Sequence, residues 1–282
     1  MKSFKPNLLP VLPFIEGETL SGYVSRLAQL HGTTPRDLCS DLGMRWPNLC
    51  SGHEDQLERL AWLTGEPFKR LKAHRTVKLD IGRYQIAKAI ATTGILRRTS
   101  VRLCPKCVSE ALQTSGPQGV FQRLEWTVNC LHICPYHCCH VIELPAGKYT
   151  HSTYDFVSRV LDHIEEVKLA SQNTGNFSPT VFEHYIRNRL YYGWQSDWLQ
   201  TLDLCQIHRA SLTLGAPLDG YRDNRYLNDI SVEQERQFCQ TGFARLMKGP
   251  DEFKSALLDL YGAGDTERPY YSSDLGAFYY WL

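Results

Sequence analysis

The chain has 282 residues, of which 43% are hydrophobic and 22% charged, and a net charge of only +1; this is the composition of a folded globular protein with one large domain or two to three small ones. It contains no run of roughly 18 apolar residues, so we expect no transmembrane helix, and prolines interrupt its first residues in a way that disfavours a signal peptide. Ten cysteines without a secretion signal indicate reduced thiols and a metal site in a cytoplasmic protein, and they disfavour a disulfide framework.

The chain begins with a proline-rich arm and continues into two short helices. Three prolines within residues 1–17 predict an extended arm whose apolar side chains cover a surface of the same domain or of a partner. Apolar residues recur at three- and four-residue steps over Leu20–Leu30, which is the period of an amphipathic helix. Thr34 as N-cap and Pro35 in the first position begin a second helix, which Gly43 ends.

Helix, short turn and helix form a helix-turn-helix-like pattern, which in DNA-binding proteins places the second helix in the major groove. Here the second helix carries one basic residue, Arg36, and two acidic residues, Asp37 and Asp41. Acidic side chains are poor partners for phosphates. The pattern therefore fits a packing unit at least as well as a DNA-reading unit, and both interpretations stay open.

Further helical patterns follow before the first metal-ligating motif. Residues 53–64 repeat the helical period and end at Gly65, and Pro67 begins another short helix. The pattern of residues 76–94 is ambiguous between helix and other structure, and residues 84–91 are a candidate for a helix.

The segment from Pro67 to Cys107 is strongly basic. It carries eleven lysines and arginines and a single aspartate, which gives it a net charge of +10, so the rest of the chain is net acidic. Such a local excess indicates contact with nucleic-acid phosphates, although a charged face exposed to solvent is the simpler interpretation. The basic residues that we predict to contact nucleic acid are Lys69, Arg70, Lys72, Arg75, Arg97, Arg98 and Arg102.

Two short motifs with the spacing of metal ligands lie close together. Cys104 and Cys107 flank Pro-Lys, Cys134 and His137 flank Pro-Tyr, and 26 residues separate the two pairs. Four such donors complete a tetrahedral shell, the arrangement of structural zinc, whereas a catalytic zinc keeps one position open for water. We therefore predict a structural Zn²⁺ bound by all four residues. A nucleophile–base pair formed by Cys134 and His137 is a weaker alternative.

Other cysteines and histidines near these motifs leave the ligand set open. Cys130 and His132 could replace the second pair, or a second ion could bind. Cys138, Cys139 and His140 fit better as packing residues, because free cysteines are commonly buried as small hydrophobes.

Two strands are expected around the metal site. Residues 121–128 partly alternate apolar and polar side chains, and residues 141–144 form a second short strand pattern. Trp126 is expected to pack over the metal site, because a small zinc module has little other core.

The remaining chain is helical in pattern and carries no recognised catalytic motif. Nucleotide-binding glycine loops, GxSxG, HExxH and acidic metal triads are absent from the sequence, so we do not expect an enzyme. The aromatic stretch over residues 270–281 is expected to dock on the body of the protein unless the chain belongs to a longer protein. Helices are predicted over residues 154–168, 180–192, 197–214, 231–246 and 252–261.

These patterns together predict a mainly α-helical protein with a small zinc-bound β module. The expected organisation is a proline-rich arm with a helix-turn-helix-like region and basic segment over residues 1–100, a central zinc finger over 101–150, and a helical C-terminal region over 151–282. The metal would fix the fold between the helix-turn-helix-like region and the helical remainder.

As a set, several of these stretches resemble the TniQ family. Leu12-Pro13 followed by Gly17-Glu-Thr-Leu-Ser-Gly-Tyr-Val-Ser-Arg-Leu-Ala28 is similar to the opening of TniQ proteins. That family's zinc module is resembled, in the same order, by Cys104-Pro-Lys-Cys107, Arg123-x-x-Trp126 and Cys134-Pro-Tyr-His137. Weaker similarity to longer TniQ and TnsD relatives lies in Gly242-Phe-x-x-Leu246, Pro250-x-x-Phe253 and Tyr280-Trp-Leu282.

The resemblance implies a target-selection adaptor of Tn7-like or Tn5053-like transposons, which is not itself the transposase. Such an adaptor recognises target DNA or an RNA-guided CRISPR effector and recruits an AAA+ ATPase of the TnsC or TniB type. The resemblance also implies zinc at the four predicted ligands, structural roles for Arg123 and Trp126, and a bacterial cytoplasmic location. A homodimer is one state that the resemblance allows. A transcription regulator that binds DNA through the helix-turn-helix and zinc finger is the alternative, and a zinc hydrolase is a third.

Overall fold

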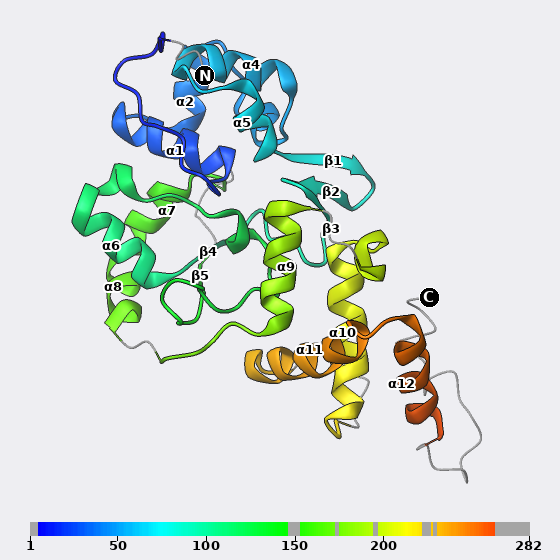
Figure 1. The fold of residues 1–282 in the computed structure, drawn as a ribbon. Helices are drawn as coiled ribbons and strands as arrows, with labels where there is room; N and C mark the ends of the chain where they lie inside the picture. Colours follow the sequence, from blue (N-terminus) through cyan, green and yellow to red (C-terminus); the bar gives the residue numbers. More distant parts are fainter. Residues whose placement is uncertain are drawn as a thin grey trace. The chain divides into compact units, whose positions relative to one another are not determined.

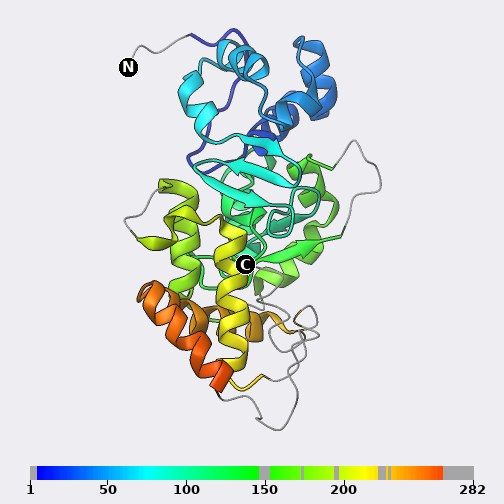
Figure 2. The same ribbon diagram turned by 90° about the vertical axis from the view of Figure 1, so that its right-hand side faces the viewer.

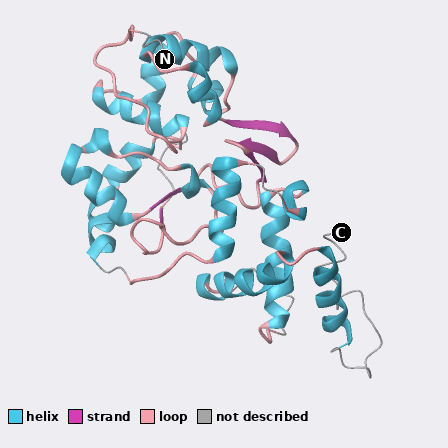
Figure 3. Ribbon diagram, viewed as in Figure 1, coloured by secondary structure: helices cyan, strands magenta, loops and turns pink. Residues whose placement is uncertain are grey.

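The computed structural model shows a mainly α-helical chain with two small antiparallel sheets, as the sequence predicts (Figure 1 and Figure 3). The strands lie within residues 76–103 and 142–144, and helices dominate the rest of the described chain. Among the described residues, no helix is both long and apolar enough to cross a bilayer. The residues that the structure describes are 5–145, 153–172, 175–193, 197–221, 227 and 230–262.

The chain divides into two compact units, which we describe separately. The first comprises Met1–Pro179 and Leu190–Gly193, and the second comprises Thr180–Arg189 and Trp194–Leu282. The three regions expected from the sequence stay a prediction. The aromatic stretch over residues 270–281 lies outside the described residues.

The first unit begins with short helices whose ends follow the sequence signals. The Thr19 hydroxyl caps the first helix by accepting a hydrogen bond from the Gly22 amide, and the Thr34 hydroxyl caps the second in the same way. Both helices were predicted, whereas the five-residue helix that begins at Trp46 was not. The helices are α1 (Leu20–Leu30), α2 (Pro35–Asp41), α3 (Trp46–Cys50), α4 (Glu54–Thr64) and α5 (Phe68–Ala73).

These helices share one apolar core, and the proline-rich arm covers part of it. Tyr23 and Leu27 of α1 are fully buried with Leu57 of α4. Phe14 of the arm is buried in the same core, and the amide of Leu8 donates to the carbonyl of Leu63. The predicted arm therefore packs on its own domain over the described residues.

A three-stranded antiparallel sheet follows, and its strands lie side by side in cyan and teal in Figure 2. Its strands are β1 (Thr76–Asp80), β2 (Arg83–Ile86) and β3 (Ala89–Thr92), paired in sequence order. The candidate helix over residues 84–91 is therefore wrong. The stretch alternates buried and exposed side chains in β3, and Gly82 supplies the positive φ of 76° that the β1–β2 turn uses.

The metal-ligating motifs lie in a small module of mixed structure. Its elements are β4 (Val101–Leu103), α6 (Pro105–Ser115), the 3-10 helices η1 (Pro117–Gly119) and η2 (Leu124–Thr127), and β5 (Ile142–Leu144), which pairs antiparallel with β4. The strand at residues 141–144 is confirmed. The strand predicted over residues 121–128 is wrong, because all four residues of η2 are buried and a one-faced alternation does not apply there.

A chain of polar contacts joins α1 to this module. The amide of Leu124 donates to the carbonyl of Gly17, and the Thr19 amide donates to the carbonyl of Gln122. The Arg26 guanidinium donates to the carbonyl of Gln118 and forms a buried ion pair with Glu18 at 2.7 Å. The start of α1 is therefore bonded to the segment that precedes η2.

Two helices complete the first unit where one was predicted. They are α7 (Phe156–Asp162) and α8 (Ile164–Gln172), and His163 between them leaves the helical conformation with φ −118° and ψ 26°. The Ser25 hydroxyl of α1 donates to the carboxylate of Asp155, the N-cap of α7, at 2.5 Å. This buried contact ties α7 to α1.

The second unit is built from helices. They are α9 (Val181–Tyr192), whose residues from Leu190 onward belong to the first unit, the 3-10 helix η4 (Trp198–Thr201), α10 (Leu204–Leu218), α11 (Val232–Leu246) and α12 (Pro250–Gly262). A capping box of Ser231 with Gln234 begins α11, the helix predicted over residues 231–246. The predicted end of α10 at residue 214 is wrong, because the helix continues through Gly215 and ends at Leu218 with Pro217 inside its last turn.

Helices α10 and α11 cross at a pair of glycines. A Cβ atom added at Gly215 would lie 1.8 Å from the carbonyl oxygen of Phe238, and one added at Gly242 would lie 1.9 Å from that of Ser211. Both obstacles are backbone atoms, which cannot rotate away. The helix backbones are therefore in direct contact, and this explains why α10 tolerates glycine in its interior.

Substitution of Gly242 by Ala tests this contact. In an ordinary helix the change would stabilise by up to about 1 kcal/mol, but here the helices must separate, which costs roughly 1–3 kcal/mol or more. We expect faster amide hydrogen exchange in α10 and α11 of Gly242→Ala than of the wild type. Gln237→Ala, an exposed position on the same helix, is the control and should leave exchange unchanged; equal protection in both variants would contradict the close crossing.

Candidate metal centre

The first pair of predicted ligands lies at the start of a helix. Cys104 is the N-cap of α6, and its Sγ accepts a hydrogen bond from the amide of Cys107 at 3.4 Å. Pro105 occupies the first helical position, where its missing N–H costs no hydrogen bond. The motif was expected as a tight turn, and the structure makes that turn the first turn of α6.

The second pair lies on the loop between η2 and β5. The amide of Cys138 donates to the carbonyl of Cys134, and the amide of Cys134 donates to the carbonyl of Cys139, both at 2.9 Å. Cys138 takes a positive φ of 50° to close this turn. The turn directs Cys134 and His137 toward the same point.

The structure brings the four predicted ligands together. The ligating atoms of Cys104, Cys107, Cys134 and His137 all lie within 4.8 Å of one another. Nδ1 of His137 is 3.2 Å from the sulfur of Cys107, and the sulfurs of Cys107 and Cys134 are 3.7 Å apart. Three sulfurs and one imidazole nitrogen therefore surround one point, and the cluster could hold a metal ion.

The electrostatics of the sulfurs fit a bound cation. Hydrogen bonding with Cys104 and Cys107 lowers the pKa of the Cys134 thiol to about 2, and hydrogen bonding with Cys107 raises the pKa of Cys104. The three groups thus share protons, since their thiolates would repel one another at these distances. A divalent cation among them removes that conflict, because metal-bound thiols are deprotonated.

A carboxylate orients the histidine of the cluster. Nε2 of His137 lies 2.9 Å from Oε1 of Glu110, while its Nδ1 faces the sulfurs. Metal-ligating histidines commonly donate their second ring nitrogen to a carboxylate, which fixes the tautomer. Glu110 was not among the residues predicted from the sequence, because no helix was predicted after Cys104. On α6 it lies one turn after Cys107, and that spacing would have indicated it.

The neighbouring cysteines and histidines stay outside the cluster of four. Cys139 comes nearest, with its sulfur 3.5 Å from that of Cys104. Cys139 is buried, as expected of a packing cysteine, whereas Cys138 is half-buried, and the ring of His140 contacts that of Phe177 at 4.3 Å. Cys130, named above as an alternative ligand, is also buried. Over the described residues, the group able to hold an ion does not include them.

Trp126 and Arg123 lie beside the cluster. Trp126 is 2% exposed and belongs to the apolar core that contains Cys104 and Cys134. Its ring stacks on Phe156 of α7, with centroids 6.0 Å apart. Arg123 is the N-cap residue of η2, and its guanidinium lies over the ring of Tyr136.

Part of the basic segment is neutralised by carboxylates of the same unit. Arg70 forms an ion pair with Glu66 at 3.0 Å. Lys72 and Arg75 both contact Glu54, at 2.6 and 2.8 Å. These three predicted nucleic-acid contacts therefore belong to a mixed-charge surface, where a phosphate would compete with existing partners.

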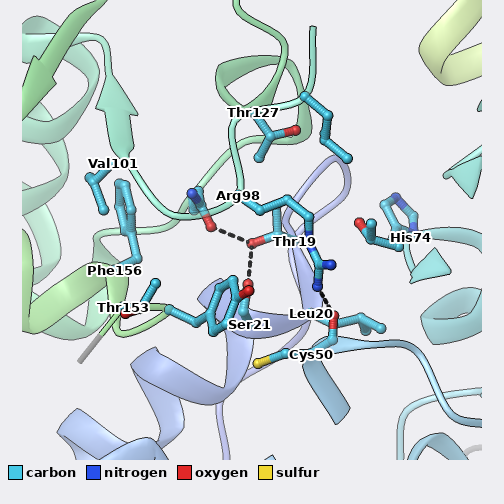
Figure 4. A pocket seen from close by; sticks show the side chains of 14 residues that line it. Thr19, Leu20, Ser21, Cys50, His74, Arg98, Val101, Thr127, Thr153 and Phe156 are labelled. Atoms are coloured by element: carbon cyan, nitrogen blue, oxygen red, sulfur yellow. Dashed lines mark hydrogen bonds between the residues drawn. The ribbon is translucent and has the colours of Figure 1, made fainter. Parts of the chain in front are cut away.

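Two other predicted contacts point into the protein. Arg102 is 4% exposed and donates to the carbonyls of Val128 and Leu131 at 2.6 and 3.0 Å. Figure 4 shows Arg98 directed at the carbonyl of Cys50, to which it donates at 3.0 Å. The cavity beside Arg98 measures about 40 Å³, room for water molecules and too little for an organic ligand.

The last two predicted contacts are open to solvent. Lys69 on α5 and Arg97 after β3 are exposed, and neither side chain forms an ion pair with a described residue. Exposed Lys78, Arg83 and Lys88 of the sheet region add to this charge, although Arg83 contacts Asp80 at 3.1 Å.

Comparison with known protein families gives one match. Residues 10–141 match the family model of TniQ, and a comparison with curated proteins found no match. The matched region runs from the arm to the segment just before β5, so it includes the helix-turn-helix-like region and the four-donor cluster. TniQ proteins are a family of transposition adaptors associated with target selection. The chain therefore carries a TniQ domain over residues 10–141.

Proposed function

We propose that the protein is a target-selection adaptor of a bacterial transposon, which links a target to an AAA+ ATPase of the TnsC or TniB type. The target is either DNA or an RNA-guided effector complex. The observation that carries the proposal is the TniQ match over residues 10–141, which covers the α1–α5 region together with the metal module. The polar contacts that join α1 to the module support treating them as one recognition body.

The metal of this body is proposed to be Zn²⁺. Three cysteine sulfurs and one histidine nitrogen are the soft and borderline donors that select zinc, and four protein donors leave no position for a substrate. When bound, zinc supplies folding energy and takes no part in chemistry. Cys104 and Cys107 hold it from α6, Cys134 and His137 hold it from the loop, and Glu110 fixes the His137 ring.

Nucleic-acid contact is proposed for the solvent-exposed part of the basic segment. Lys69 and Arg97 support this role best, because neither has a carboxylate partner among the described residues. Helix α2 does not support a recognition helix, because it has only seven residues and carries Asp37 and Asp41. The proposed contact is therefore with phosphates and independent of base sequence.

The adaptor role is tested by reconstitution with an AAA+ ATPase of the TnsC or TniB type. We expect the protein to retain that ATPase on target DNA or on the guide complex, and transposition to fail when the protein is left out. Tight sequence-specific DNA binding without any effect on the ATPase would instead indicate a transcription regulator.

Loss of a ligand should remove the metal and unfold the module. In Cys104→Ser and His137→Ala we expect no bound zinc and a lower melting temperature, because the roughly 10–16 kcal/mol of structural zinc binding is also folding energy. Elemental analysis and thermal unfolding are the measurements. Cys138→Ser, which lies outside the four-donor cluster, should keep one zinc per chain; ligand variants that melt like the wild type would contradict the proposed zinc role.

Removal of the Glu110 carboxylate should weaken zinc binding without removing a ligand. For Glu110→Gln we expect roughly 10–100-fold faster loss of zinc to a chelator, because the His137 ring loses the acceptor that orients it. The readout is zinc transfer to a coloured chelator over time. Glu143→Gln makes the same change of charge at an exposed position of β5 and should release zinc at the wild-type rate.

Reversal of the two exposed charges should reduce the salt dependence of DNA binding. For the double variant Lys69→Glu and Arg97→Glu we expect weaker binding to a random-sequence duplex and a slope of log K against log salt that is smaller by about 0.9 for each lost phosphate contact. Fluorescence anisotropy over a salt series measures both. Lys5→Glu with Lys254→Glu is the matched control, because both lysines are exposed and form no ion pair with a described residue. An equal effect of both pairs would exclude a localised contact.

A further inference from the structure

A groove of about 400 Å³ opens beside the metal cluster. One wall is the face of α6 that carries Ala111 and Thr114, and the other carries the rings of Phe121 and Tyr136. Arg123 also lines the groove. Its volume is within the range of small-molecule and peptide side-chain pockets, and neither the metal nor the exposed basic residues account for it.

Arg123 is surrounded by aromatic rings and has no polar partner. Its guanidinium carbon lies 4.3 Å from the ring centre of Tyr136, 4.8 Å from that of Phe121 and 6.0 Å from that of Trp126. No hydrogen bond or ion pair joins the guanidinium to a described residue, and its Nε is buried without a partner. The rings hold the guanidinium in place, while its hydrogen-bond donors remain available to a ligand.

The carboxylates nearest in sequence and in the groove already have other partners. Glu110 contacts Nε2 of His137, and Glu125 accepts a hydrogen bond from the hydroxyl of Tyr191. Neither forms an ion pair with Arg123. Against the effect of burial, the charges of Cys107 and Glu125 act on the guanidinium and raise the pKa of Arg123, but no described residue accepts a hydrogen bond from its Nε.

We propose that this groove binds a segment of a partner protein through one Asp or Glu carboxylate held by Arg123. A guanidinium matches a carboxylate with two parallel hydrogen bonds, and prior ring packing lowers the entropy cost of forming them. The apolar and aromatic walls fit an apolar side chain next to that carboxylate. A nucleic-acid strand fits poorly, because it needs several cations along its backbone and Arg123 is the single lysine or arginine lining the groove.

The proposal rests on the proposed function in one respect, namely that an adaptor has protein partners. Its test needs no transposition protein, however, so the two can fail separately. Failure of ATPase recruitment by the wild-type protein would count against the adaptor role, and failure of peptide binding counts against the groove alone.

The test is NMR spectroscopy of arginine side chains in the metal-loaded full chain. The probes are the peptides acetyl-Asp-Phe-amide and acetyl-Asn-Phe-amide, and Arg123→Lys assigns the Arg123 signals by their loss. We expect the Asp peptide to shift the Arg123 Nε and Nη signals saturably. The Asn peptide should bind at least about 10-fold more weakly, because it lacks the charge-assisted hydrogen bonds.

A pair of variants on α6 localises the binding without altering Arg123. Thr114→Glu adds a negative charge to the groove wall and should weaken the Asp peptide by at least about 10-fold. Gln113→Glu adds the same charge at the next, exposed residue, which does not line the groove, and should bind like the wild type. Zinc content and circular dichroism confirm that both variants are folded.

Three results would overturn the proposal. Equal binding of the two peptides would show that no carboxylate is recognised, and absence of any shift up to millimolar peptide would leave Arg123 with a packing role only. A shift of the Arg123 signals by a six-residue thymidine oligonucleotide, with none by the Asp peptide, would assign the groove to nucleic acid.

Discussion

The first unit depends on one constraint: two ligand pairs that are 26 residues apart in the chain must meet at one point. Closing a loop of that length costs about 3 kcal/mol of chain entropy before any contact is formed. The closed loop aligns β4 with β5 and buries Trp126 against Phe156. A metal bound by the four donors would offset this cost together with the apolar core that the module shares with α7 and α8.

The residues at the start of α1 contact the loop that lies between the two ligand pairs. Gly17, Glu18 and Thr19 form hydrogen bonds or a bridge with residues 122–124, and Arg26 reaches Gln118. Burial raises the pKa of Glu18 to about 8, while the charge of Arg26 opposes that shift. A buried carboxylate is tolerated only with such a partner, so these two residues are fixed in relation to each other and to the metal module.

Predictions from the sequence were correct where a local signal, such as a helix cap or a ligand spacing, decides the structure. Thr34 caps its helix as predicted, and the four ligands predicted from their spacing form one cluster that could hold a metal ion. Predictions from the sequence were wrong where tertiary contacts decide the local structure. The segment before Val128 alternates like a strand but is buried on all sides, and Gly215 lies inside a helix because Gly242 lets the backbones touch. Arg102 was predicted to contact nucleic acid as part of the basic segment, but its guanidinium donates hydrogen bonds to buried backbone carbonyls.

The position of Cys104 and Cys107 in the first turn of α6 has a consequence for synthesis. The helix N-terminus favours thiolates, so the first pair is reactive as soon as α6 forms. At about 5–20 residues per second, the ribosome needs roughly 1–5 s to add the 26 residues that separate Cys107 from Cys134. During that interval the nascent chain exposes half a binding site, and its thiols are open to oxidation or to a wrong metal until the second half emerges.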